Sequence, residues 1–127
     1  MDLLNVTVLG DPVVKSRPRV GKGRGYTPKR TVAAEAVIRT AALEAYGFPT
    51  AWPDPVGIDV TFYCATRRRT DGDNLLKLVT DALQQNKKAE RAVIVDDSQI
   101  LDWHCRLHRR VEGQEPRTEI RLYCLDV

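Results

Sequence analysis

Three aspartates, at positions 71, 73 and 97, have the residue type and spacing to perform chemistry together. Asp71 and Asp73 flank Gly72 just before a helix is expected to begin, and residues two apart in an extended segment project to the same side. Asp97 follows a short apolar segment farther along the chain. If that segment lies beside the strand that ends near Cys64, Asp97 reaches the same edge of the sheet. The sequence therefore predicts that three carboxylates converge.

Converging carboxylates repel one another, and without a cation at least one of them tends to hold a proton. Oxygen ligands with no nearby His or Cys favour Mg²⁺ or Mn²⁺ over zinc, and such ions suit phosphodiester hydrolysis. Lys77 lies one helical turn beyond Asp73, where its ammonium could stabilise the transition state or, alternatively, position the phosphate. The predicted catalytic residues are Asp71, Asp73, Asp97 and Lys77, with the three aspartates as metal ligands.

Each of these residues also has a purely structural interpretation. Asp71 and Asp73 suit the start of a helix, where carboxylates cap the backbone and complement the dipole. The pair Asp96 and Asp97 could form a polar turn, and Lys77 could be an ordinary exposed partner in a helix. Taken singly, the structural interpretation is the better one. The combination of acidic residues with nearby basic runs favours catalysis.

Two basic runs precede the paired aspartates. Residues 12–30 contain seven basic side chains and no acidic one, and three arginines come directly before Thr70. Local positive potential attracts phosphate backbones and makes binding sensitive to salt. The alternative is a solvated arm that aids solubility. The predicted DNA-binding residues are Lys15, Arg17, Arg19, Lys22, Arg24, Lys29, Arg30, Arg67, Arg68 and Arg69.

The elements expected to position these residues follow from hydrophobic periodicity. Alternation predicts strands at residues 4–8, 56–64, 101–107 and 120–124, and a short buried strand at 93–95. Helical spacing and end signals predict helices at 28–46 and 73–85. The first helix is expected to face inward with Val32, Ala36, Val37 and Leu43, and the last two strands to pair as an antiparallel hairpin. Residues 13–26, rich in glycine, are expected to form a mobile basic loop.

The order of these elements predicts an α+β fold, with two main helices packed on a mixed, mostly antiparallel sheet. A chain of 127 residues suits a single domain spanning 1–127. No apolar run is long enough to cross a bilayer, and the start of the chain does not resemble a secretion signal, so a cytoplasmic protein is expected.

The cysteines and histidines are not expected to form functional sites. Cys64, Cys105 and Cys124 are odd in number and widely spaced, which favours buried thiols over a disulfide framework or a structural zinc site. His104 and His108 share one side of a strand but lie about 13 Å apart along it, too far to share an ion easily. We therefore expect them to be surface or groove residues.

The block Arg-Arg-Arg-Thr-Asp-Gly-Asp-Asn-Leu-Leu-Lys at residues 67–77 resembles the RusA family of Holliday-junction resolvases. The likeness continues in Asp-Ala-Leu at 81–83 and Asp-Asp-Ser-Gln-Ile at 96–100, and near the start in Gly-Asp-Pro at 10–12 and Tyr-Thr-Pro at 26–28. This resemblance implies a homodimeric, Mg²⁺-dependent endonuclease that introduces paired nicks in a four-way DNA junction, with no organic cofactor, in a bacterium or encoded by a phage. The family's catalytic aspartates fall on Asp71, Asp73 and Asp97, and its catalytic lysine falls on Lys77.

Two other functions remain open on the sequence. One is a catalytically silent module that binds DNA junctions or duplexes through the basic arm. The other is a nuclease that acts on other branched DNA or on single strands.

Overall fold

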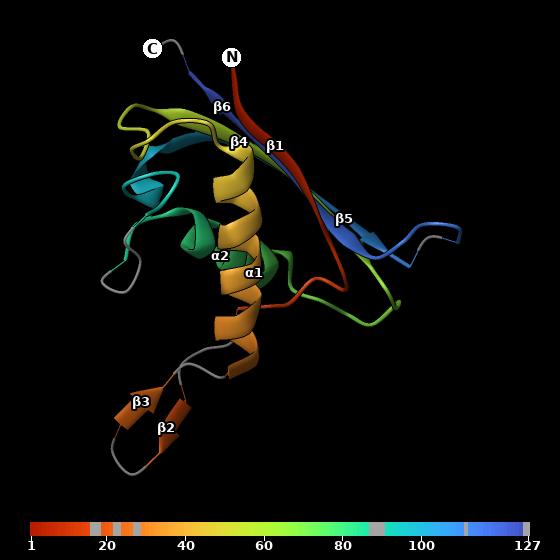
Figure 1. The fold of residues 1–127 in the computed structure, drawn as a ribbon. Helices are drawn as coiled ribbons and strands as arrows, with labels where there is room; N and C mark the ends of the chain where they lie inside the picture. The colour runs from red at the N-terminus through yellow and green to blue at the C-terminus, as the bar shows by residue number, and fades with distance from the viewer. Residues whose placement is uncertain (16–18, 22–23, 27–28, 87–90, 111, 126–127) are drawn as a thin grey trace.

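A computed structural model describes residues 1–15, 19–21, 24–26, 29–86, 91–110 and 112–125. Two helices pack on one face of a four-stranded sheet, so the molecule has two layers (Figure 1). The predicted α+β class, with two main helices on one sheet, is confirmed. Within the described residues, no helix has both the length and the apolar character needed to span a membrane.

The sheet has the strand order β1, β6, β4, β5, with β1 at Asp2–Leu9, β6 at Arg117–Cys124, β4 at Val56–Cys64 and β5 at Ile100–Arg109. β6 runs antiparallel to both β1 and β4, whereas β5 runs parallel to β4. The sheet is therefore mixed and mostly antiparallel, as predicted. Ile58 and Val60 of β4 are fully buried, which is consistent with a central position.

The predicted hairpin between the last two strands is wrong. β5 and β6 do not pair, because β4 lies between them and takes both as neighbours. The alternation in a strand groups its side chains by face but carries no information about which strand lies next to it. β5 is consequently an edge strand, with Leu101 and Trp103 exposed.

The helices are α1 at Lys29–Ala45 and α2 at Gly72–Leu83, close to the predicted ranges. α2 buries one apolar face that includes Leu75, Val79 and Leu83, as expected. The predicted inner face of α1 is wrong, since Val32 and Val37 are 53% and 56% exposed. Ala36 is also exposed, Leu43 is only partly buried, and the buried residues of α1 are Thr31, Ile38 and Ala42.

Two local predictions also need correction. Residues 93–95 do not form a strand of the sheet; Ile94 makes isolated bridges to Trp52 and Gln84, and Val95 is 46% exposed. The segment 13–26, predicted to be a loop, contains two short strands, β2 at Arg19–Gly21 and β3 at Arg24–Tyr26. They pair as an antiparallel hairpin that projects from the body beside the start of α1 (Figure 1).

Arg39 of α1 joins the two helices at the end of α2. Its Nε donates to the carbonyl of Ala82 at 2.9 Å, and its Nη2 donates to the carbonyls of Asp81 and Gln84 at 2.9 and 3.3 Å. The last carbonyls of a helix lack partners within the helix and carry negative partial charge. The last turn of α2 has no basic residue of its own, so α1 supplies the missing cation. This contact fixes the end of α2 that carries Asp81 and Gln84.

Candidate active site

The loop between β4 and α2 is held at both ends before it delivers Asp71 to the helix. The backbone N–H of Ala65 donates to Asp11 Oδ1 at 2.8 Å, which ties the start of the loop to the segment after β1. Near the other end, Arg109 Nη2 donates to the carbonyl of Thr70 at 3.4 Å. These two contacts limit how far the loop can move.

Asp71 is the N-cap of α2. Its Oδ1 accepts the backbone N–H of Asp73 at 3.0 Å, and its Oδ2 accepts from Asn74 Nδ2 at 3.2 Å. Asp71 therefore does cap the helix, as its structural interpretation predicts, and capping is compatible with a second role as a metal ligand. Because both oxygens are held by hydrogen bonds, the direction of this exposed carboxylate is set by the helix itself.

Asp73 lies exposed in the first turn of α2 and acts on the neighbouring strand β5. The pKa of the Cys105 thiol is raised, first by partial burial of the sulfur and then by the negative charges of Asp73 and Asp59. Asp73 is thus close enough to β5 for its charge to be felt there.

Lys77 connects the two acidic segments. Its Nζ lies 3.2 Å from Asp81 Oδ1 and 3.5 Å from Asp97 Oδ2. The hydrogen bond with Asp81 raises the pKa of Lys77, and the charges of Asp81 and Asp97 raise it further, so the side chain is an ammonium at neutral pH. Since Asp73 lies four residues before Lys77 on the same helix, Asp97 faces the side of α2 that carries Asp73.

Asp97 begins a short 3-10 helix, η1 at Asp97–Gln99, and its neighbour Asp96 is the N-cap of that turn. Asp96 Oδ2 accepts the backbone N–H of Ser98 at 3.0 Å, and Gln99 Oε1 accepts the N–H of Asp96 at 3.0 Å. Hydrogen bonds from Ser98 lower the pKa of Asp96. The two adjacent aspartates are therefore different: Asp96 caps the turn, and Asp97 presents its carboxylate to Lys77.

The donor set fits a hard divalent cation, because Asp71, Asp73 and Asp97 offer carboxylate oxygens alone. The three carboxylates do not form a ready metal site. In the part of the chain that the structure describes, no three His, Cys, Asp or Glu side chains form a metal-binding group. The structure brings Lys77 to Asp97 and keeps Asp73 on the same helix face. It does not bring all three aspartates to one point.

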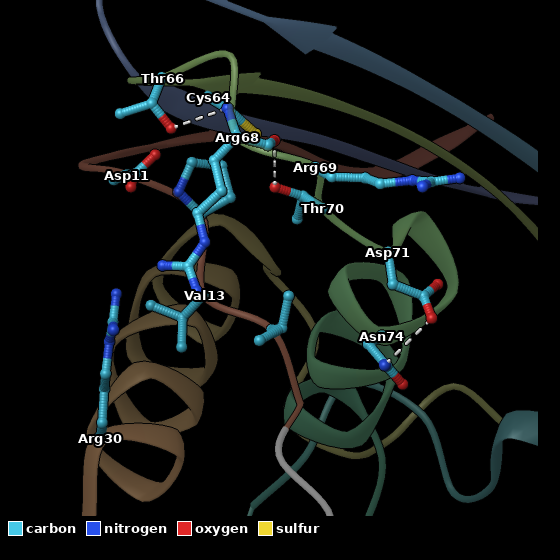
Figure 2. A pocket seen from close by; sticks show the side chains of 12 residues that line it. Asp11, Val13, Arg30, Cys64, Thr66, Arg68, Arg69, Thr70, Asp71 and Asn74 are labelled. Carbon is cyan, nitrogen blue, oxygen red and sulfur yellow. Dashed lines mark hydrogen bonds between the residues drawn. The ribbon is translucent and has the colours of Figure 1, made fainter.

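A pocket of about 350 Å³ lies beside Asp71, between the start of α1, the segment after β1 and the loop before α2. Figure 2 shows Arg30 and Arg68 on one side of it and Asp71 with Asn74 on the other. Arg69 also belongs to its lining, and Asp11 contributes a second carboxylate. The pocket therefore puts arginines close to one of the predicted catalytic carboxylates.

The family model for the RusA endodeoxyribonuclease matches residues 10–123, which is nearly the whole chain. The chain belongs to the RusA family. The resemblance noted in the sequence is thus confirmed, and endonucleolytic cleavage of DNA is the activity that family membership supports. Comparison with curated proteins found no match.

The basic residues predicted for DNA binding divide into four groups in this RusA-family chain. Lys29, Arg30, Arg67, Arg68 and Arg69 are exposed. Arg19 is the first residue of β2 and Arg24 the first residue of β3, while Arg17 and Lys22 fall outside the described residues. Lys15 differs from the others, because its Nζ forms ion pairs with Glu35 and with Asp81, the latter at 3.2 Å. Because these ion pairs engage its ammonium, Lys15 is not part of the proposed DNA-binding set.

Sequence reasoning gave no role to two residues that contact the candidate site. Asp81 pairs with Lys77, and Gln84 Oε1 accepts the backbone N–H of Asp97 at 2.9 Å. Asp81 lies four residues after Lys77, which is the spacing of an ion pair on a helix, so this contact could have been anticipated. Gln84 had no comparable indication, since its partner is distant in the sequence.

Both histidines of this RusA-family chain contact side chains of the sheet. His104 Nε2 lies 3.2 Å from Asp102 Oδ2, and the ring of His108 stacks on Tyr63 with centroids 4.8 Å apart. His104 is exposed and His108 is half-buried. The three cysteines are free, as predicted, but only Cys64 is buried, whereas Cys105 is exposed and Cys124 is partly buried.

Proposed function

We propose that this chain is a Mg²⁺-dependent endonuclease that resolves four-way DNA junctions by paired phosphodiester hydrolysis, acting as a homodimer in a bacterial cytoplasm. The observation that carries the proposal is the 3.5 Å approach of Lys77 Nζ to Asp97 Oδ2, which joins α2 to η1. It supports a single site built from both acidic segments, because Asp73 lies one turn before Lys77. Family membership supports the reaction class.

We assign Asp71, Asp73 and Asp97 to hold Mg²⁺, and we expect Mn²⁺ to substitute because it prefers the same oxygen ligands. When bound, the ion would supply a more acidic water and positive charge opposite the phosphate. Asp71 would offer a carboxylate whose direction is fixed by its N-cap contacts at 3.0 and 3.2 Å. Hydrolysis of a phosphodiester needs no organic cofactor, and none is proposed.

Lys77 would stabilise the charge that develops on the phosphate. Its side chain is half exposed, so the ammonium can reach a bound phosphate while Asp81 and Asp97 hold it. A preorganised cation at the reacting group lowers the transition-state energy without reorganisation during the reaction. Positioning of the ground-state phosphate is the alternative role for the same side chain.

The exposed arginines would hold the DNA backbone beside this site. Arg30, Arg68 and Arg69 line the pocket next to Asp71, so a strand bound there would pass close to the carboxylates (Figure 2). Guanidinium groups bind phosphate in a bidentate manner and stay charged at all relevant pH values. The hairpin of β2 and β3 carries Arg19 and Arg24 on a projecting element and would extend the contact along the DNA.

Replacing Arg30 and Arg68 together by Gln is expected to weaken junction binding for all DNA sequences. Each lost phosphate contact should lower the slope of log K against log salt concentration by about 0.9. Titrations at several salt concentrations measure this slope. The matched control is Arg121→Gln, because Arg121 pairs with Asp2 at 2.9 Å on the sheet face away from the helices. Equal slopes for the double variant and the wild type would exclude this pocket from the DNA path.

The proposed homodimer suits a two-fold substrate, and the free edge of β5 is the surface we assign to it. Leu101 and Trp103 are 59% and 45% exposed on this strand. If two copies of β5 pair antiparallel about a two-fold axis at His104, Asp102 of one copy lies opposite Arg106 of the other. Cross-strand pairs of opposite charge stabilise such a contact, and the exposed strand edge supplies unpaired backbone groups.

Light scattering tests this interface. We expect a mass of twice 14.3 kDa for the wild type and a shift toward 14.3 kDa for Trp103→Lys. Leu9→Lys is the control, because Leu9 is 65% exposed on the opposite edge strand β1. A wild-type monomer in the concentration range of the cleavage assay would contradict the homodimer, and a dimeric Trp103→Lys would contradict the assignment to β5.

A further inference from the structure

Five side chains of alternating charge form a network of ion pairs next to the candidate active site. Glu35 of α1 pairs with Lys15, Lys15 pairs with Asp81 at 3.2 Å, Asp81 pairs with Lys77 at 3.2 Å, and Lys77 approaches Asp97 at 3.5 Å. This ion-pair network links α1, the segment after β1, α2 and η1. Its last two members belong to the proposed catalytic set, and the first three do not.

Asp81 is the centre of this ion-pair network, and both of its carboxylate oxygens have polar partners. Oδ1 accepts from Lys77 Nζ and from Gln84 Nε2, the latter at 3.1 Å, while Oδ2 faces Lys15. The side chain is only 16% exposed. Its own backbone carbonyl is held by Arg39 at 2.9 Å. Asp81 is therefore a fixed carboxylate that points at Lys77 from within the protein.

Gln84 connects the same carboxylate to the second acidic segment. Its Oε1 accepts the backbone N–H of Asp97 at 2.9 Å, and its Nε2 donates to Asp81 Oδ1 at 3.1 Å. The two contacts require opposite ends of the amide, so each one supports the orientation that the other needs. A single carboxamide thus sets the distance between the end of α2 and the start of η1.

We infer that Asp81 and Gln84 are positioning residues that hold Lys77 and Asp97 in the geometry needed at the scissile phosphate, an inference that rests on the proposed function. The physical reason is the flexibility of Lys77, whose side chain is 52% exposed and reaches its ammonium through a four-carbon stem. Without Asp81 the ammonium would lose its buried anchor and spread over many rotamers. Without Gln84, Asp97 would lose the hydrogen bond that fixes its backbone.

The first test is Asp81→Asn, which keeps the size of the side chain and removes its charge. Single-turnover cleavage of a synthetic four-way junction with Mg²⁺ is expected to fall about ten- to hundredfold, with unchanged junction affinity. Asp81→Glu should restore part of the rate. The matched control is Glu35→Gln, which breaks the other ion pair of Lys15 without touching Lys77 and should leave the rate unchanged. Equal losses in Asp81→Asn and Glu35→Gln would mean that the network only supports the fold.

A double-mutant cycle tests whether Asp81 acts through Lys77. In a Lys77→Met background, Asp81→Asn should change the rate by less than about twofold, because the group it positions is gone. A full further loss in that background overturns the inference. If Asp81→Asn melts below the assay temperature, Gln84→Met serves as a single variant instead: the same loss of rate at unchanged junction affinity is expected, and a wild-type rate overturns the inference. A wild type that does not cut junctions would defeat the proposed function, whereas an active wild type matched by Asp81→Asn would defeat this inference alone.

Discussion

Asp73→Asn is expected to lower the rate of junction cleavage by more than about a hundredfold. Loss of a residue that only hydrogen-bonds to a metal ligand typically lowers activity by about ten- to hundredfold, and a ligand itself should matter more. The substitution keeps the shape of the side chain and removes one anionic oxygen donor. The side chain of Asp73 is not the N-cap of α2, which is Asp71, so the fold should be unchanged. Junction binding should be retained or strengthened, because a negative charge near the phosphates is lost. Single-turnover cleavage and binding measured on the same junction test both parts.

Asp96→Asn is the matched control for this substitution. Asp96 is an exposed aspartate that caps η1, and asparagine is an equally good cap. We expect normal cleavage from this variant, although it removes the same charge a single residue away from Asp97. Cleavage by Asp73→Asn at the wild-type rate would remove Asp73 from the site. A folded wild type that binds junctions but never cuts them would instead favour the catalytically silent binding module.

Lys77→Met is expected to reduce single-turnover cleavage by about a hundredfold or more, a typical cost for removing a preorganised charge from a transition state. The methionine keeps most of the aliphatic length and removes the ammonium. If Lys77 acts in the transition state, the loss falls on the cleavage rate while the affinity for the junction changes little. Comparing the single-turnover rate with the dissociation constant separates the two effects.

Lys77→Arg is the charge-preserving variant to compare with Lys77→Met. It preserves the charge but changes its shape and reach, so a partial rate is expected. If Lys77→Met instead weakens binding and leaves the rate at saturation unchanged, the lysine positions the ground-state phosphate, which is the alternative role. Unchanged rate and binding would exclude both roles.

The placement of the candidate residues on α2 could be predicted from the sequence because it depends on local spacing. Asp71, Asp73 and Lys77 occupy the start of one helix, where a pattern of two and four residues already decides which side chains share a face. The helix α2 and the strand β4 were predicted for the same reason, since a single strong periodicity sets each of them. The position of Asp97 after a short apolar segment predicts that it reaches the same site, and the fold brings it to 3.5 Å from Lys77.

What could not be predicted depends on neighbours that are distant in the sequence. Alternation in β5 and β6 groups their side chains by face, but only packing decides that β4 lies between the two strands. Lys15 looked like one more cation of a DNA-binding run, and only the fold brings it to Glu35 and Asp81. The separation of roles between Asp96 and Asp97 likewise follows from the turn geometry of η1.

The most direct test of the central claim is the cleavage of a synthetic four-way junction by the purified chain, with and without a divalent ion. We predict paired nicks on opposing strands in Mg²⁺ or Mn²⁺, no cleavage in a chelator, and loss of cleavage in both Asp73→Asn and Asp97→Asn. That pattern requires carboxylates from both acidic segments in one site. Cleavage that persists in the chelator, or that survives Asp97→Asn at the full rate, would contradict the account.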